Sequence, residues 1–112
     1  MDVFTRADRE VVEVTDGVYL AQLVSGEAMS AQYFRLEPGA SLPEHSHEHE
    51  QTGYVTTGVL TLVVNGEERR VGADDAYLIP GDEPHAAENR TDGLVEGVDV
   101  FSPPRDPSDH PV

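Results

Sequence analysis

The chain has 112 residues, of which 38% are hydrophobic, so one domain over residues 1–112 with a modest core is expected. It has 22 acidic residues against 7 basic ones, a formal net charge of −15, and no cysteine. The lack of cysteine excludes disulfides, thiolate zinc sites, iron–sulfur clusters and a cysteine nucleophile. The negative charge argues against nucleic-acid and anionic-membrane partners, because both would be repelled.

No apolar run approaches the roughly 18 residues of a membrane span. Residues 1–6 also lack the basic-then-apolar pattern of a signal peptide. A cytoplasmic location is therefore the expectation.

The acidic residues are distributed along the chain rather than gathered in a tail, from Asp2 to Asp109, and all seven bases are arginine. A surface of this kind stays soluble at high salt, where ions screen its self-repulsion. The combination resembles that of proteins from salt-loving archaea, and the alternative is an ordinary acidic protein.

Short runs rich in Val, Tyr, Thr and Leu alternate with glycine and proline turns, which is typical of β-strands. In chain order the runs are Val11–Val14, Gly17–Val24, Met29–Leu36, Gly53–Val64, Glu67–Val71 and Val95–Phe101. No segment keeps a helical period for three turns, although the first ten residues could form one helical turn or fray. The pattern predicts an all-β sandwich or small barrel.

Two further signals concern the connections. Asn65-Gly66 lies between Val59–Val64 and Glu67–Val71 and predicts a tight hairpin, because both residues accept the positive φ of a type I′ turn. From Ser102 the chain becomes proline-rich and polar, which predicts an extended tail over residues 102–112.

Three of the five histidines, His45, His47 and His49, lie within five residues, and His85 follows forty residues later. On a strand, His45 and His47 would point to one face, and Gln51 shares their parity if no bulge intervenes. Imidazole is a common ligand of first-row transition metals, so these residues predict a metal site. The alternative is a histidine-rich surface loop without a role, since polar residues alternate with the histidines.

The residues around the first cluster have a recognisable spacing. Gly39, His45, His47 and Gly58 match the first cupin motif, which runs glycine, five residues, His-x-His, three or four residues, Glu, six residues, glycine. Gln51 stands at the position of the motif's glutamate.

The second cupin motif contains Pro-x-Gly-x-x-His-x-x-x-Asn, and Pro80, His85 and Asn89 match it. Asp74 and Asp82 stand at its two glycine positions. Two neighbouring glycines are expected to supply the turns instead, namely Gly72 and Gly81.

The chain thus resembles a single-domain cupin over about residues 17–101. The resemblance implies a double-stranded β-helix, a jelly-roll barrel whose wide mouth holds a metal ion. It also implies one divalent transition metal, such as Zn, Ni, Mn or Fe. Matched residue by residue, its ligands would be His45, His47, Gln51 and His85.

An amide in place of a carboxylate leaves the metal its full charge, which should strengthen its Lewis acidity and lower its affinity. Glu50 is a rival fourth ligand, but its parity is opposite to that of the histidines. His49 could be an outer-shell partner, a pocket wall or a solvent-exposed residue.

A narrower resemblance, carried by residues 45–55 and 99–105, is to the cupins of pectin degradation, which convert unsaturated uronates to linear keto forms. It implies Asp99, Phe101 and Arg105 as pocket residues. The residues suit such chemistry: a carboxylate can move a proton, a guanidinium can bind a substrate carboxylate, and an aromatic ring can form a wall. The alternative for Asp99 is a surface acid, for Phe101 an ordinary core residue, and for Arg105 a surface charge.

These observations favour a metal-dependent, isomerase-like enzyme that opens or tautomerises a small anionic sugar such as an unsaturated uronate. A metal-dependent dioxygenase and a sensor that binds a small ligand without turnover are the alternatives, and the missing carboxylate ligand argues mildly against an iron oxygenase. A homodimer is also expected, because Val11–Val14 could pair with a neighbouring copy at an open sheet edge.

The charge generates a prediction about stability. We expect the melting temperature to rise between millimolar and molar KCl, because the Debye length falls from about 10 Å at 0.1 M to about 3 Å at 1 M. Relief of about 1 kcal/mol of repulsion should raise the melting temperature by roughly 4–8 °C in a scanning calorimeter. A melting temperature that does not change over this range would contradict the halophilic interpretation.

Overall fold

The computed structural model describes residues 1–106, and the regular secondary structure of these residues is almost entirely β-strand. A 3₁₀ turn, η1 (Arg6–Asp8), precedes the strands, so the first ten residues do contain one helical turn. The strands are β1 (Val12–Thr15), β2 (Val18–Ser25), β3 (Ser30–Leu36), β4 (Ser41–His45), β5 (Glu50–Thr57), β6 (Val59–Val64), β7 (Glu67–Gly72), β8 (Ala76–Ile79), β9 (His85–Glu88) and β10 (Val95–Ser102). No helix among residues 1–106 is long and apolar enough to cross a membrane.

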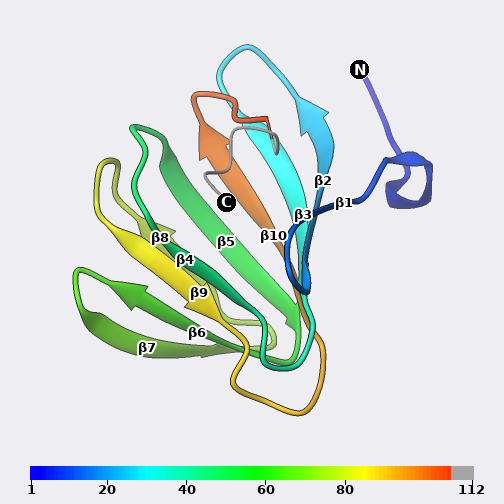
Figure 1. Ribbon diagram of the computed structural model, residues 1–112. Helices are drawn as coiled ribbons and strands as arrows, with labels where there is room; N and C mark the ends of the chain where they lie inside the picture. Colours follow the sequence, from blue (N-terminus) through cyan, green and yellow to red (C-terminus); the bar gives the residue numbers. More distant parts are fainter. Residues whose placement is uncertain (107–112) are drawn as a thin grey trace.

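The strands form two antiparallel sheets that face each other (Figure 1). One sheet has six strands in the order β1-β2-β3-β10-β5-β8, and the other has four in the order β4-β9-β6-β7. This confirms the predicted all-β jelly roll. Within the described residues no strand pairing joins the sheets, so the barrel expected from the sequence is an open pair of jelly-roll sheets.

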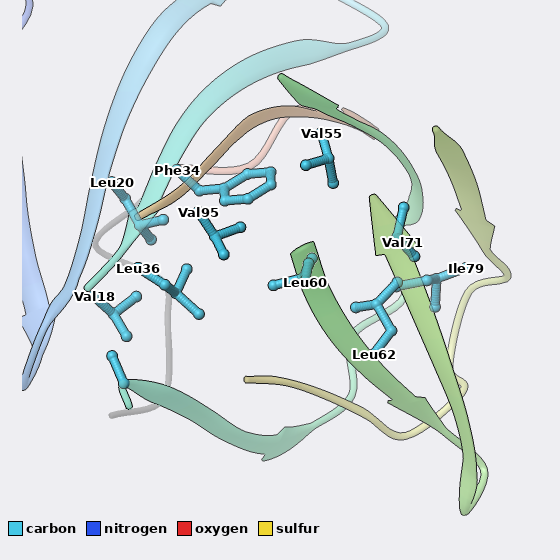
Figure 2. Packing of buried hydrophobic residues seen from close by; sticks show 11 residues of the cluster. Val18, Leu20, Phe34, Leu36, Val55, Leu60, Leu62, Val71, Ile79 and Val95 are labelled. Carbon is cyan, nitrogen blue, oxygen red and sulfur yellow. The ribbon is translucent and has the colours of Figure 1, made fainter. Parts of the chain in front are cut away.

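The inner faces of the two sheets enclose the hydrophobic core (Figure 2). Its buried members are Val18, Leu20, Phe34, Leu36, Ala40, Val55, Leu60, Leu62, Val71, Ile79 and Val95. Because burial of one large aliphatic or aromatic side chain contributes about 1.5–3 kcal/mol, this cluster is the main term that holds the sheets together.

The predicted run Gly53–Val64 is two strands rather than one. Gly58 has a φ of +80° and separates β5 in the six-stranded sheet from β6 in the four-stranded sheet. A Cβ at Gly58 would lie 2.2 Å from the carbonyl oxygen of Leu94, so this crossing requires glycine. The hairpin prediction is confirmed, since Asn65 and Gly66 have φ values of 50° and 79° between β6 and β7.

The turns of the second motif differ from the expectation. Asp74 and Asp82 themselves adopt positive φ, 71° and 66°, and neither Gly72 nor Gly81 does so. Aspartate tolerates the left-handed region better than most residues with a Cβ. The backbone N–H of Asp82 donates to the carbonyl of His47 at 2.7 Å, so this turn also supports the histidine segment.

The start of the predicted tail is packed against the sheet rather than extended into solvent. The backbone N–H of Arg105 donates to Ser30 Oγ at 2.9 Å, and that hydroxyl donates to the carbonyl of Arg105 at 3.3 Å. Only 3% of the Arg105 surface is exposed. The remainder of the predicted tail, residues 107–112, lies outside the described residues.

The predicted N-terminal run is strand β1, which pairs with β2 and forms one edge of the six-stranded sheet. We propose that a second copy pairs with this edge, because an open edge presents unpaired backbone groups. Sedimentation in high salt should then give the mass of a dimer. Val12→Lys, on β1, should weaken the dimer at least about tenfold, since edge lysines oppose strand pairing.

Val24→Lys is the matched control for this experiment. Val12 and Val24 are 42% and 40% exposed, but Val24 lies on β2, beyond the residues of that strand that pair with β1. A wild-type protein that sediments as a monomer, or equal effects of the two lysines, would exclude pairing through β1.

Candidate metal centre

The histidine segment connects the two sheets. Strand β4 ends at His45 in the four-stranded sheet, and β5 begins at Glu50 in the six-stranded sheet. The assumption that His45, His47 and Gln51 lie on one strand is therefore wrong, because the chain leaves one sheet and enters the other between them. His85, at the start of β9, pairs directly with His45.

The crossing brings His45, His47 and His85 together. One potential ligand atom from each lies within 4.8 Å of those of the other two. The ring centroids are 4.3 Å apart for His45 and His85, 4.9 Å for His47 and His85, and 5.6 Å for His45 and His47. This spacing allows the three imidazoles to converge on one ion.

Each of the three rings is oriented by a nearby backbone carbonyl. The Nδ1 atoms of the three histidines lie near the carbonyl oxygens of Pro43 (3.0 Å from His45), His49 (3.1 Å from His47) and Glu83 (2.8 Å from His85). A carbonyl only accepts, so each Nδ1 carries the proton and each neutral ring has its lone pair on Nε2. The Nε2 atoms of His47 and His85 are buried and have no hydrogen-bond partner among residues 1–106.

Electrostatics favours the neutral form that metal ligation requires. Burial is the main cause that lowers the pKa values of all three histidines, to about 4 for His47. The positive charge of Arg105 lowers them further. Neutral imidazoles bind a metal without first losing a proton.

Gln51 faces the interior and Glu50 faces solvent, as strand alternation along β5 requires. The Gln51 side chain forms a hydrogen bond with Asp99. An ionised carboxylate only accepts hydrogen bonds, so the Gln51 amide nitrogen is the donor to Asp99, and Oε1 takes no part in this bond. Oε1 is buried without a hydrogen-bond partner in the described part of the chain, which makes it available as an oxygen ligand.

Gln51, His45 and His85 border an internal cavity of about 40 Å³. Its polar lining consists of Gln32, His45, Gln51, Tyr77, His85 and Asp99, and the rest is apolar. This volume holds one ordered water or a single oxygen-bearing group of a ligand. Buried acceptor atoms that have no hydrogen-bond partner among residues 1–106 gather around this small cavity. They fit a divalent cation with nitrogen and oxygen ligands.

Asp99 lies on the inner face of β10 and is 7% exposed. It accepts a hydrogen bond of 2.5 Å from the Tyr77 hydroxyl. Burial raises the pKa of Asp99 to about 6, against the lowering effects of the hydrogen bonds from Tyr77 and Gln51 and of the Arg105 charge. A carboxyl group with a pKa in this range can both accept and release a proton near neutral pH.

Phe101 and Arg105 are both buried beside the histidines. The Phe101 ring lies 5.7 Å from His47 and 6.1 Å from His49, and Phe101 does not belong to the main hydrophobic cluster. The Arg105 guanidinium lies 5.4 Å from the centre of the Phe101 ring. Because Arg105 is 3% exposed, the alternative of a surface charge is wrong.

His49 lies outside the converging group of three histidines in the described chain. Its carbonyl accepts from His47, its own Nε2 lies 3.3 Å from the carbonyl of Pro104, and its ring centroid is 5.2 Å from that of His47. Of the three roles left open, that of an outer-shell partner agrees best with these contacts, and the backbone carbonyl of His49 rather than its ring makes the hydrogen bond to His47.

Three residues of this region were missed at the level of sequence. Gln32 lines the cavity from β3, Tyr77 bonds to Asp99 from β8, and Gly53 lies between Tyr77 and Asp99 on β5. Gly53 carried a usable signal, since glycine inside a strand marks a close approach of neighbouring groups. For Gln32 and Tyr77 no local pattern distinguished them from ordinary strand residues.

Comparison with known proteins agrees with this geometry. The cupin domain model matches residues 32–101, more than half of the chain, so the chain belongs to the cupin family. Among its relatives is the pectin degradation protein KdgF of Dickeya dadantii (strain 3937), 30% identical over 94 residues that cover 83% of this chain and 84% of the relative. Another is H2HPP isomerase of Bacillus subtilis, 29% identical over 92 residues that cover 81% of this chain and 39% of that protein. The chain thus spans about two fifths of the second relative.

Solved structures with similar folds include KdgF from Halomonas sp., with a TM-score of 0.87 and 28% identity, covering 95% of this chain and 96% of that one. An RmlC-like cupin from Shewanella frigidimarina NCIMB 400 has a TM-score of 0.84 and 25% identity, covering 95% and 94% of the two chains. The cupin fold expected from the two sequence motifs is thereby confirmed.

The converging histidines generate a prediction about metal binding. His85→Ala should raise the dissociation constant for Zn²⁺ or Ni²⁺ by more than roughly 100-fold, because loss of a ligand should exceed the 10–100-fold cost of losing an outer-shell partner. Titration calorimetry on untagged, metal-free protein measures it. His49→Ala is the matched control, since it keeps the backbone carbonyl that orients His47, and it should change the constant by less than about tenfold. Equal effects of the two variants would contradict the three-histidine site.

Proposed function

We propose that this cupin is a metal-dependent isomerase that opens or tautomerises a small anionic sugar, such as an unsaturated uronate, to a linear keto form. The observation that carries the proposal is the position of Asp99. Its buried carboxyl group contacts Gln51 and shares a cavity with His45 and His85.

The residues that would hold the metal are His45, His47, His85 and Gln51. The metal would supply Lewis acidity toward a carbonyl or hydroxyl oxygen of the substrate. The fit rests on His47 Nε2, His85 Nε2 and Gln51 Oε1, buried atoms that find no hydrogen-bond partner within residues 1–106. An amide ligand adds no negative charge, so the site suits an anionic substrate.

Asp99 would move the proton. In ring opening, a hemiacetal hydroxyl would lose its proton to the Asp99 carboxylate, and its oxygen would form a C=O bond as the ring C–O bond breaks. The released enolate would then take the proton back from Asp99 on carbon. Atoms and electrons balance within the substrate, so no oxidant or reductant is required. The bonds from Tyr77 and Gln51 hold the carboxyl group in place for this transfer.

Arg105 and Gln32 would bind the substrate. The Arg105 guanidinium suits a substrate carboxylate, because its planar fork can bind two oxygens. Gln32 is 1% exposed, and its buried Oε1 has no hydrogen-bond partner in residues 1–106, so it can accept from a substrate hydroxyl. Phe101 would provide an apolar wall beside Arg105.

The relatives agree with this proposal through their names. One is described as a pectin degradation protein and another as an isomerase. Uronates are the acidic sugars of pectin, and isomerisation is the reaction class that the Asp99 geometry supports.

An anaerobic assay tests the reaction class. Metal-loaded protein is incubated with an unsaturated uronate without oxygen, and loss of the conjugated chromophore is followed together with the NMR spectrum of the product. We expect conversion to the keto form without oxygen. Turnover that requires oxygen would indicate the dioxygenase, and binding without product would indicate the sensor.

Substitution of Asp99 tests the proton transfer. Asp99→Asn should lower kcat by about 10²–10⁴-fold at saturating metal, because an amide does not exchange a proton near neutral pH. Asp74→Asn is the matched control. Asp74 also accepts a hydrogen bond from a tyrosine hydroxyl, at 2.8 Å, but at an exposed position, and asparagine tolerates its positive φ. A fully active Asp99→Asn protein would exclude the role given to Asp99.

A further inference from the structure

Asp99, Gly53 and Tyr77 occupy neighbouring positions on three adjacent strands. Asp99 on β10 pairs with Gly53 on β5, and Gly53 pairs with Tyr77 on β8. A Cβ at Gly53 would lie 2.1 Å from Tyr77 Cζ, 2.3 Å from the Tyr77 hydroxyl and 2.5 Å from Asp99 Oδ1. The missing side chain of Gly53 therefore provides the space through which Tyr77 reaches Asp99.

The hydroxyl group of Tyr77 is the donor in this contact. It lies 2.5 Å from Asp99 Oδ1, and a carboxylate oxygen can only accept. Burial and the neighbouring Asp99 charge raise the pKa of Tyr77 well above its ordinary value, so the phenol keeps its proton. The bond to Tyr77 restrains rotation of the Asp99 carboxyl group about its last torsion.

Asp99 also holds Gln51, and this second contact sets the direction of the amide. A side-chain amide can turn over and exchange the places of its oxygen and nitrogen. With nitrogen toward Asp99, Oε1 is left buried and without a hydrogen-bond partner among the described residues, as the structure shows. In the reverse orientation an amide oxygen would face a carboxylate, and an NH₂ group that cannot bind a metal would take the place of Oε1.

We propose that Tyr77, placed over Gly53, is a positioning residue that acts through Asp99 to present Gln51 Oε1 as a metal ligand. This inference rests on the metal centre of the proposed function but not on its substrate. The order of the contacts is Tyr77 to Asp99 to Gln51, and each step is a hydrogen bond to one carboxyl group.

A purely structural role for Tyr77 must be distinguished from this one. Tyr77 also lines an open groove of about 710 Å³ between β7 and β8, together with Leu62 and Ile79, which border the inner cavity as well. If the ring only fills this wall, the hydroxyl group has no effect on Gln51. Removal of the hydroxyl alone, by Tyr77→Phe, separates the two roles.

The first test is a metal titration of untagged protein with Co²⁺ alone, followed by calorimetry and by the visible absorption of the bound ion. Tyr77→Phe should raise the dissociation constant about tenfold, the lower end of the range for outer-shell partners, and alter the Co²⁺ spectrum. Tyr54→Phe is the matched control. It removes a tyrosine–aspartate bond of 2.8 Å at an exposed position on the same sheet, and it should change neither readout.

A double substitution shows whether the effect passes through Gln51. In a Gln51→Ala background, Tyr77→Phe should cause no further loss of Co²⁺ affinity. An equal tenfold loss in that background, or no loss in the wild-type background, would overturn the proposal.

A second readout needs neither metal nor substrate. In ¹⁵N NMR spectra of metal-free protein, the Gln51 side-chain NH₂ signal, assigned by its absence in Gln51→Ala, should exchange slowly with water. Tyr77→Phe should accelerate that exchange, and Tyr54→Phe should not. Unchanged exchange in Tyr77→Phe would overturn the positioning role of Tyr77. If the Co²⁺ and NMR results agree with that role but no uronate is converted, the proposed function fails and the positioning role stands.

Discussion

The candidate site depends on three hydrogen bonds between histidine Nδ1 atoms and backbone carbonyls two residues away. Each bond places the proton on Nδ1 and the lone pair on Nε2, so all three rings direct an acceptor nitrogen to the same region. Without these bonds the imidazoles could rotate or change tautomer. The ligand atoms that lie within 4.8 Å of one another would then not be fixed as the nitrogens that carry a lone pair. The backbone N–H of Asp82 donates to the His47 carbonyl at 2.7 Å and links the turn before His85 to the segment that carries His47.

The site lies in the same interior as the hydrophobic core. Aliphatic and aromatic side chains of both sheets pack together and also border a small cavity, whose polar lining comes from β3, β4, β5, β8, β9 and β10. A buried polar atom without a partner costs about 1–3 kcal/mol, and Gln32, His47, Gln51 and His85 each contribute one within residues 1–106. The hydrophobic cluster offsets this cost, so the chain can keep unsatisfied ligands in position for an ion and a substrate.

The elements that the sequence predicted well are those whose signal is local. Asn65-Gly66 specifies a type I′ turn through its own φ preferences, and alternation along Val95–Phe101 places Asp99 and Phe101 on one face wherever the strand lies. The errors arose where a local pattern was extended across a crossing. Gly53–Val64 looked continuous although Gly58 moves the chain between sheets, and the strand parity of His45 and Gln51 lost its meaning once the chain changed sheet between them.

By itself the sequence determined the all-β class, the cupin motifs and the candidate residues, because spacing, turn chemistry and side-chain type are properties of neighbouring residues. Only the tertiary structure decided which of these residues meet. The pairing of His45 with His85, the burial of Arg105 against Ser30 and the contact of Tyr77 with Asp99 join residues from 22 to 75 positions apart. Such contacts are set by strand order and by the missing side chain of Gly53, which allows two distant side chains to share one place in the sheet.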